Sequence, residues 1–80
     1  MIRPARRIGI LGLGAIGRPV ARALARGMPG LTLAGATSRD AGRAREFLAG
    51  LPGAPPLLGF GELLERADVV VEAATQAALV

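Results

Sequence analysis

The chain has 80 residues, of which 51% are hydrophobic and 20% are charged, so it is too apolar to be disordered and long enough for one small domain or part of a larger one. Its net charge is +4, but with two Phe and no Trp, Tyr or His it lacks the stacking aromatics of a typical nucleic-acid-binding module, and we expect no nucleic-acid partner. The absence of Cys and His excludes a disulfide framework and a zinc site built from these ligands.

The first seven residues, MIRPARR, are a basic lead-in to the first apolar run. That run is too short and too often interrupted by glycine for the core of a signal peptide, and no later stretch reaches the roughly 20 apolar residues of a membrane-spanning helix. We therefore expect a cytoplasmic protein with no membrane partner. Arg7 is interpreted as a surface charge rather than as a ligand-binding residue.

The stretch from Ile8 to Gly17, IGILGLGAIG, is the most informative part of the sequence. Its apolar first half predicts a buried central strand, and it then contains three glycines with the spacing G-x-G-x-x-G, followed by an amphipathic helix and a second strand. This order is the context in which the glycine pattern indicates a dinucleotide-binding βαβ unit. The alternative is a glycine-rich turn that only closes the connection between strand and helix.

Each glycine has a separate physical role in this interpretation. Gly12 permits a tight turn at the strand end, Gly14 leaves the backbone bare where a pyrophosphate approaches, and Gly17 lets the helix pack closely on the strand. Free backbone N–H groups near Ala15 and Ile16, together with the positive end of the helix dipole, supply an anion site without a basic side chain. The predicted cofactor is NAD or NADP.

The helix is predicted from about Ala15 to Arg26, with its regular part starting nearer Gly17 because Pro19 removes a backbone hydrogen bond. Apolar side chains recur every four residues on one side and are expected to face the sheet, while Arg side chains recur on the opposite, solvated side. The apolar positions are Ile16, Val20 and Leu24, and the basic positions are Arg18, Arg22 and Arg26. The segment GMPG at 27–30 is predicted to end the helix and turn the chain back.

A second strand is predicted at 31–37, LTLAGAT, and its end bears on cofactor choice. NAD-binding folds place a carboxylate here for the ribose 2′-hydroxyl, whereas an Arg can accommodate the 2′-phosphate of NADP. In this chain Ser38 and Arg39 follow the strand, so both are predicted cofactor-binding residues and the site is expected to accept both cofactors. Asp40 is interpreted as the N-cap of a helix at 41–49 rather than as a ribose ligand.

The last third of the chain is predicted to add two strands and one helix. After a proline-rich link at 51–56, these are a short strand at Leu57 and Leu58, a helix at 61–66 with Leu63 and Leu64 facing inward, and a strand at 68–73 buried on both faces. Ala74 and Thr75 follow the carboxyl end of the last strand, where ligands bind in open α/β sheets, and are predicted to contact the cofactor. Glu72, a lone carboxylate there, is interpreted as structural or supporting rather than catalytic.

Together these elements predict an α/β fold, a Rossmann-type parallel sheet with flanking helices, of which this chain holds about four strands and three helices. A full doubly wound sheet has about six strands, so residues 1–80 are interpreted as the amino-terminal part of an NAD(P)-binding domain, with the catalytic and substrate domain outside this chain. The predicted cofactor-binding residues are Gly12, Gly14, Ala15, Ile16, Gly17, Ser38, Arg39, Ala74 and Thr75, and no catalytic residue or metal ligand is assigned.

Three stretches carry a resemblance to a known family: GILGLGAIGRPVARAL, SRD with the Ala- and Arg-rich segment after it, and ERADVVVEAA. They cover nearly all of the chain and resemble the amino-terminal part of the L-aspartate dehydrogenase family. The resemblance implies an oxidoreductase that moves a hydride between the α-carbon of L-aspartate and C4 of the nicotinamide, with iminoaspartate as the oxidised product. It also implies a role in pyridine nucleotide biosynthesis, and the full-length protein is expected to be a homo-oligomer, most simply a dimer.

The family's catalytic His and substrate-binding residues cannot be carried over, because they lie in the later part of the family's chains and this sequence has no His. Two alternatives stay open. One is a different dehydrogenase with the same cofactor-binding half, such as a homoserine dehydrogenase, a dihydrodipicolinate reductase or a relative of glucose-fructose oxidoreductase. The other is a non-catalytic nucleotide-sensing domain of a regulator.

Overall fold

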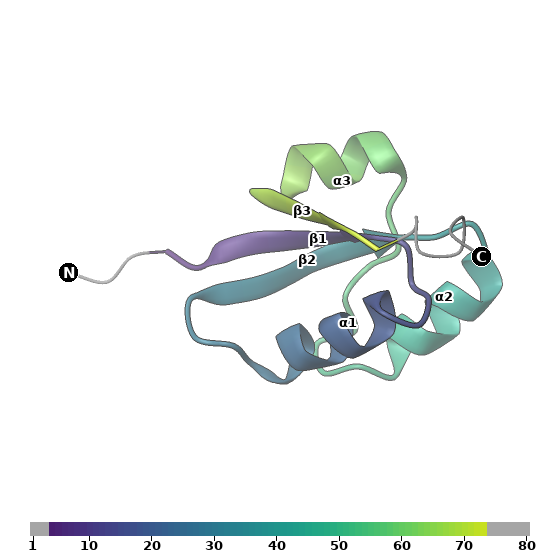
Figure 1. Cartoon of the computed structure of the whole chain (residues 1–80), viewed down its shortest axis with the longest axis horizontal. Coiled ribbons are helices and arrows are strands. Elements are labelled where there is room, and N and C mark those ends of the chain that lie inside the picture. Colours follow the sequence, from purple (N-terminus) through teal and green to yellow (C-terminus); the bar gives the residue numbers. More distant parts are fainter. Residues whose placement is uncertain (1–3, 74–80) are drawn as a thin grey trace.

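The computed structural model describes residues 4–73, which form three strands and three helices (Figure 1). No helix in this part of the chain is long and apolar enough to span a membrane. In chain order the elements are β1 (Arg6–Leu11), α1 (Gly17–Arg26), β2 (Leu31–Thr37), α2 (Ala41–Ala49), α3 (Phe60–Arg66) and β3 (Val69–Glu72). The predicted bounds of β2 and α2 are confirmed, and α1 starts at Gly17, as the position of Pro19 predicted.

The strands form one parallel sheet in the order β2-β1-β3, so β1 is the central strand. At its carboxyl end, Leu11 lies opposite Thr37 of β2 on one side and Glu72 of β3 on the other. The chain therefore passes from β1 to one neighbour and later crosses to the other, as it does at the centre of a Rossmann-type sheet. The predicted fold class is confirmed.

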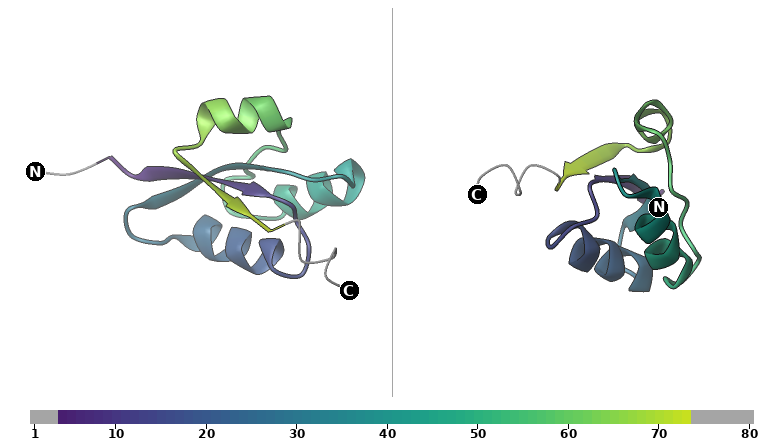
Figure 2. Two further views of the ribbon diagram at one scale, coloured as in Figure 1. Left: turned by 45° about the horizontal axis from the view of Figure 1, so that its top comes forward. Right: turned by 90° about the vertical axis from the view of Figure 1, so that its right-hand side faces the viewer.

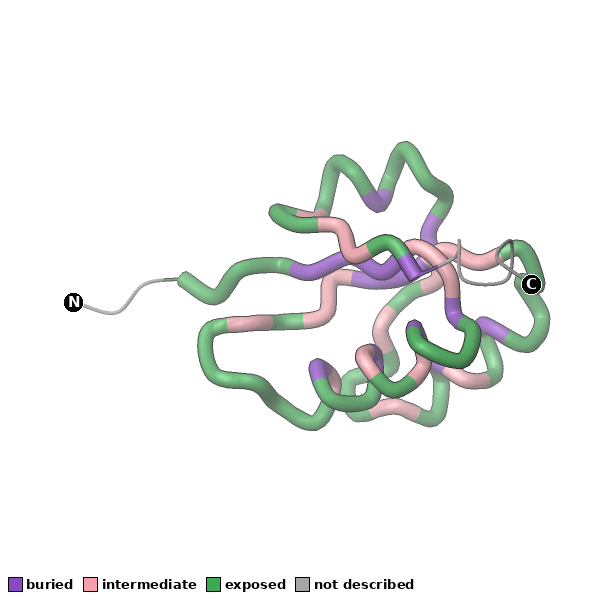
Figure 3. Tube along the Cα trace, viewed as in Figure 1, coloured by how far each residue is buried: buried purple, intermediate pink, exposed green. Residues whose placement is uncertain are grey.

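Helices cover both faces of this sheet. α1 and α2 lie on one face and α3 lies on the other (Figures 1 and 2). Gly9 is buried toward α3, because a Cβ there would lie 2.7 Å from Cδ1 of Leu63, and its missing side chain lets α3 approach the strand. The buried residues concentrate along β1 (Figure 3). A cluster of buried apolar residues joins β1 and β2 to α1 and α2, and includes Ile8, Ile10, Ala21, Leu24, Ala36, Ala44 and Leu48.

The buried side of α1 differs from the prediction. Ile16 is 54% exposed, because it precedes the helix instead of belonging to its sheet-facing row. The buried residues of α1 are Gly17, Ala21 and Leu24, while Val20 is half-buried. The row that faces the sheet is thus built mainly from small residues, which lets the helix axis approach β1 closely.

Two predictions for the last third of the chain are wrong in detail. Leu57 forms a single parallel bridge to Ala36 instead of a strand, so the described residues contain three strands rather than four. Leu63 is fully buried, but Leu64 is 52% exposed. Adjacent residues on a helix point about 100° apart, and the seven-residue helix α3 contacts the sheet through one row only.

The burial predicted for the last strand is also wrong. Val69 is 42% exposed, and Val70 and Val71 are half-buried. The reason is that β3 is an edge strand of the sheet that residues 4–73 form, with only β1 beside it. The run of valines is therefore covered on fewer sides than a central strand would be.

Candidate dinucleotide-binding site

The carboxyl ends of β1 and β3 and the amino-terminal end of α1 meet at one edge of the sheet, on the right in Figure 1. The strand order reverses at β1, because β2 lies on one side of it and β3 on the other. In open α/β sheets, ligands bind at the carboxyl edge beside such a switch point. The glycine-rich turn between β1 and α1 lies at this position.

Gly12 has a backbone conformation that other residues rarely adopt. Its φ is +99°, a value at which a Cβ is penalised. Its N–H donates to the carbonyl oxygen of Thr37 at 2.9 Å, which joins the glycine turn to the carboxyl end of β2. The predicted reason for glycine at this position is confirmed by this φ.

Gly17 lies where the first turn of α1 meets the end of β1. A Cβ on Gly17 would overlap the carbonyl oxygen of Gly12 and lie 3.5 Å from Cβ of Ala73. No side chain fits there unless the backbone moves, so the predicted close approach of helix and strand is confirmed. Gly14, in contrast, is exposed, and its backbone is accessible from solvent.

The amino-terminal end of α1 is electropositive and no side chain neutralises it. No side chain caps this end, and the first turn contains no acidic residue. The Arg18 N–H donates to the Gly14 carbonyl oxygen at 3.1 Å, but between Gly12 and Arg18 no backbone N–H donates a hydrogen bond within the described residues. Such N–H groups at the positive end of a helix dipole bind anions. With Ala15 and Ile16 exposed, this turn can accept a phosphate.

The residues after β2 lie next to the same turn, because the hydrogen bond from Gly12 to Thr37 brings the two segments together. Ser38 is half-buried and Arg39 is exposed. The Asp40 Oδ1 accepts the backbone N–H of Arg43 at 3.1 Å, so Asp40 caps α2 as predicted. Its Oδ2 lies 3.5 Å from Nε of Arg43, in an exposed ion pair.

Two arginines of α1 that the sequence pattern predicted to face solvent contact α2 instead. The guanidinium carbons of Arg18 and Arg22 each lie 5.2 Å from the centroid of the Phe47 ring. Nε of Arg18 also donates to the Leu13 carbonyl oxygen at 3.3 Å, which braces the glycine turn. The spacing of four residues predicts that the two Arg share one side of α1. The sequence contains no signal that α2 presents an aromatic ring to that side.

The remaining candidate residues lie at the carboxyl end of β3. Glu72 is exposed and lies opposite Leu11, and its supporting role stays a prediction. Ala74 and Thr75 lie outside the described residues. Within residues 4–73 no group of three or more His, Cys, Asp or Glu side chains could hold a metal ion.

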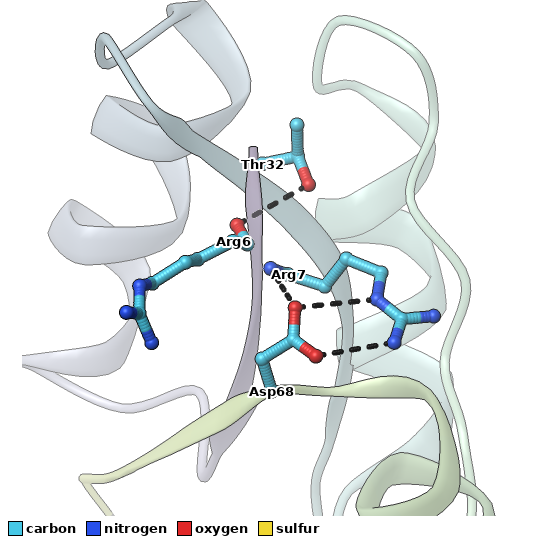
Figure 4. Close-up of polar contacts among 4 residues, drawn as sticks. All are labelled: Arg6, Arg7, Thr32 and Asp68. Carbon is cyan, nitrogen blue, oxygen red and sulfur yellow. Dashed lines mark hydrogen bonds and ion pairs between the residues drawn. The ribbon is translucent and has the colours of Figure 1, made fainter. Parts of the chain in front are cut away.

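Among residues 4–73, the ion pair with the most hydrogen bonds is that of Arg7 and Asp68, which lies at the opposite, amino-terminal edge of the sheet (Figure 4). Asp68 accepts the backbone N–H of Arg7 at 2.8 Å and its Nη2 at 3.1 Å, which joins the start of β1 to the residue before β3. The side-chain and backbone hydrogen bonds from Arg7 hold the pKa of Asp68 below its usual value. Both side chains are exposed, and this pair is structural rather than part of the candidate site.

Comparison with known proteins identifies similar chains. The profile of a protein family described as the NAD binding domain of homoserine dehydrogenase matches residues 12–80. The L-aspartate dehydrogenase of Methanocella arvoryzae is 44% identical over 73 residues, and L-aspartate dehydrogenase 3 of Bordetella bronchiseptica is 42% identical over 73 residues. These alignments cover 91% and 90% of this chain but only 27% of either relative. The resemblance predicted from the sequence is confirmed.

A solved structure has the same fold. The UDP-N-acetylglucosamine 3-dehydrogenase of Acidithiobacillus ferrooxidans superimposes with a TM-score of 0.75 and 31% sequence identity. The superposition covers 92% of this chain and 22% of that protein. The chain is thus similar in fold to one part of a larger dehydrogenase.

Proposed function

The chain belongs to the family of the NAD-binding domain of homoserine dehydrogenase, and on this premise we propose that it is the cofactor-binding part of an L-aspartate dehydrogenase. The protein would oxidise L-aspartate to iminoaspartate with NAD or NADP. The observation that carries this proposal is the 42–44% identity to L-aspartate dehydrogenases over about nine-tenths of the chain. A cofactor of the NAD(P) type also follows from the family match.

The glycine turn is the proposed site for the pyrophosphate. Its free N–H groups at the uncapped end of α1 offer hydrogen bonds to phosphate oxygens, and the accessible backbone at Gly14 leaves room for them. Gly12 and Gly17 contribute by giving the turn its shape, and Ala15 and Ile16 by their backbone N–H groups. These features favour a dinucleotide over a turn that merely connects strand and helix.

Ser38 and Arg39 are the proposed contacts for the adenosine ribose. They directly follow the strand end that the Gly12 N–H contacts, so they lie beside the phosphate turn. A neutral hydroxyl and a guanidinium at these positions do not repel the 2′-phosphate of NADP, and both cofactors should bind. Ala74 and Thr75 are proposed to lie along the cofactor at the end of β3.

When bound, the nicotinamide supplies the acceptor for the hydride from the α-carbon of aspartate. The described residues hold and orient the cofactor. The sequence has no His, Cys, Lys or Tyr, so the groups that transfer protons to and from the substrate are proposed to lie in the rest of the protein. The chain spans 27% of the length of these L-aspartate dehydrogenases, so most of their length corresponds to residues outside this chain. A cytoplasmic homodimer that acts in pyridine nucleotide biosynthesis is the proposed setting.

The substrate assignment is tested by measuring NAD(P)H formation by the full-length protein with L-aspartate and with L-homoserine. We expect turnover with aspartate and at least tenfold lower kcat/KM with homoserine, about 1.4 kcal/mol of discrimination. Preference for homoserine would instead support the activity named in the description of the matching family.

The phosphate turn is tested by Gly14→Ala. The added methyl group would project where the pyrophosphate is proposed to bind, and should weaken binding of both NADH and NADPH at least tenfold, about 1.4 kcal/mol. Titration of nucleotide fluorescence measures this effect. Unchanged affinity for both nucleotides would refute the assignment of the turn.

A further inference from the structure

Arg18 lies in the first turn of α1, and its side chain reaches back to the glycine turn. Its Nε donates to the carbonyl oxygen of Leu13 at 3.3 Å. Within the described residues, no backbone N–H donates to this oxygen and no other side chain donates to the segment 12–16. Leu13 is buried and Arg18 is half-buried, so the contact is partly shielded from water. Arg18 is thus the group that holds this carbonyl in place.

The orientation of that carbonyl determines the orientation of a backbone N–H in the phosphate turn. Leu13 and Gly14 share one planar trans peptide bond, so the oxygen of Leu13 and the N–H of Gly14 point in opposite directions. Gly14 is exposed, and its N–H donates to no group within residues 4–73. A hydrogen bond that fixes the Leu13 oxygen therefore also fixes the direction of an N–H available to a ligand.

This peptide has few other restraints against turning over. Gly12 precedes Leu13 and is held by its hydrogen bond to Thr37 at 2.9 Å, but Gly14 follows, and glycine accepts positive and negative φ about equally well. A reversal of the Leu13–Gly14 peptide would place a carbonyl oxygen where the Gly14 N–H had been. That oxygen would repel a phosphate instead of binding it.

Phe47 of α2 in turn restricts Arg18. The guanidinium carbon of Arg18 lies over the Phe47 ring, 5.2 Å from its centroid, and Arg18 forms no ion pair within the described residues. The ring is itself half-buried and packs against the apolar cluster between the helices and the sheet. The face of an aromatic ring attracts a guanidinium group. A residue far from the turn in sequence thus positions the side chain that holds it.

We propose that Phe47 and Arg18 are positioning residues, which keep the Leu13–Gly14 peptide in the orientation that binds the pyrophosphate of the cofactor. This inference rests on the proposed function, because it takes the glycine turn as the pyrophosphate site. A turn that is already ordered loses less free energy when the ligand binds. Since NAD and NADP share the pyrophosphate, the two residues contribute equally to the binding of both and do not select between them.

The first test compares Arg18→Met with Arg22→Met in the full-length protein, with binding of NADH and NADPH followed by the fluorescence of the reduced nicotinamide. Arg18→Met should raise both Kd values about tenfold. Arg22→Met is the matched control, because Arg22 lies over the same ring at the same 5.2 Å but donates no hydrogen bond to the turn. It should leave both Kd values within about twofold.

The second test separates positioning from a direct contact with the cofactor. Phe47→Leu leaves every charge in place and should raise both Kd values about fivefold, whereas Phe47→Tyr keeps the ring and should restore them to near wild type. Because Phe47 acts through Arg18, the double variant of Arg18→Met and Phe47→Leu should bind no more weakly than Arg18→Met alone. The KM for the cofactor should rise in the single variants, while kcat at saturating cofactor stays within about twofold.

Three results would overturn this inference. They are an equal loss of affinity in Arg18→Met and Arg22→Met, a loss confined to NADPH, and effects of Arg18→Met and Phe47→Leu that multiply in the double variant. The first would mean that only the positive charge matters, the second that Arg18 contacts the 2′-phosphate, and the third that Phe47 acts independently of Arg18. Each leaves the proposed function intact. Failure of the wild-type protein to bind either nucleotide would overturn the proposed function itself.

Discussion

At the scale of single residues, Gly17 is a position where an added methyl group would not fit. Its Cβ would overlap the carbonyl oxygen of Gly12, a backbone atom that cannot rotate away. Gly17→Ala should lower the free energy of unfolding by about 1–3 kcal/mol, the usual cost of forcing atoms into a packed region. Chemical denaturation of the full-length protein measures this loss.

Gly61→Ala is the matched control for that experiment. Gly61 is also a helical glycine, but a Cβ there would have no neighbour within 4 Å. Alanine in a helix is favoured over glycine by about 0.5–1 kcal/mol, so this variant should be at least as stable as the wild type. Equal stability of Gly17→Ala and Gly61→Ala would show that α1 can shift to make room, against the close approach described above.

Cofactor preference is the second property that depends on single residues. Ser38→Asp places a carboxylate where it can accept the ribose hydroxyls of NAD and repel the 2′-phosphate of NADP, so the preference should move toward NAD. Arg39→Ala should raise the KM for NADP much more than the KM for NAD. The measurement is kcat/KM of the full-length enzyme with each cofactor. An NADP to NAD ratio that stays the same in Arg39→Ala would remove Arg39 from the proposed 2′-phosphate site.

At the scale of elements, the pair of Arg7 and Asp68 joins the start of β1 to the chain just before β3 (Figure 4). Because the hydrogen bonds from Arg7 lower the pKa of Asp68 in the folded protein, its ionised form stabilises the fold. That contribution is present above the unfolded pKa of about 3.9 and is lost as the pH falls through the lower, folded value.

Comparison with Asp68→Asn isolates this contribution. At neutral pH the wild type should have the higher Tm, and the difference should shrink once the pH falls below about 4. Since both side chains are exposed, high salt should also reduce the difference. A Tm difference that is the same at neutral and at low pH would mean that the charge of Asp68 does not contribute to stability.

At the scale of the whole molecule, residues 4–73 leave apolar side chains exposed on helix α3 and on the edge strand β3. Phe60 and Leu64 on α3 are 53% and 52% exposed, and Val69 on the edge strand β3 is 42% exposed. A parallel sheet is stable when helices cover both faces and its edges are protected. We therefore expect the 80-residue polypeptide by itself to be marginally stable and to associate.

Sedimentation and thermal melts at several protein concentrations test this expectation. The apparent Tm and the mass should both change with concentration, because association buries the exposed apolar surface. A monomer with a cooperative, concentration-independent melt above about 60 °C, near the upper end for mesophile domains, would contradict it.

The sequence by itself predicts the features that depend on local backbone chemistry. The glycine at position 12 marks a turn that needs positive φ, Pro19 limits where the regular part of α1 can begin, and Asp40 caps α2 through its own side chain. Each of these depends on residues no more than a few positions apart. For the same reason the strand, glycine turn and helix of the candidate site, and the fold class built on them, could be predicted without a structure.

The tertiary structure decides which partner each face of a helix contacts. Periodicity placed Arg18 and Arg22 on one side of α1, but only the packing of α1 beside α2 brings them over Phe47. In the same way, Leu64 is exposed because α3 contacts the sheet through a single row. The hydrophobic pattern predicts the side of a helix on which a side chain lies. The residues that it contacts there are distant in sequence, so only the packing of the whole chain determines them.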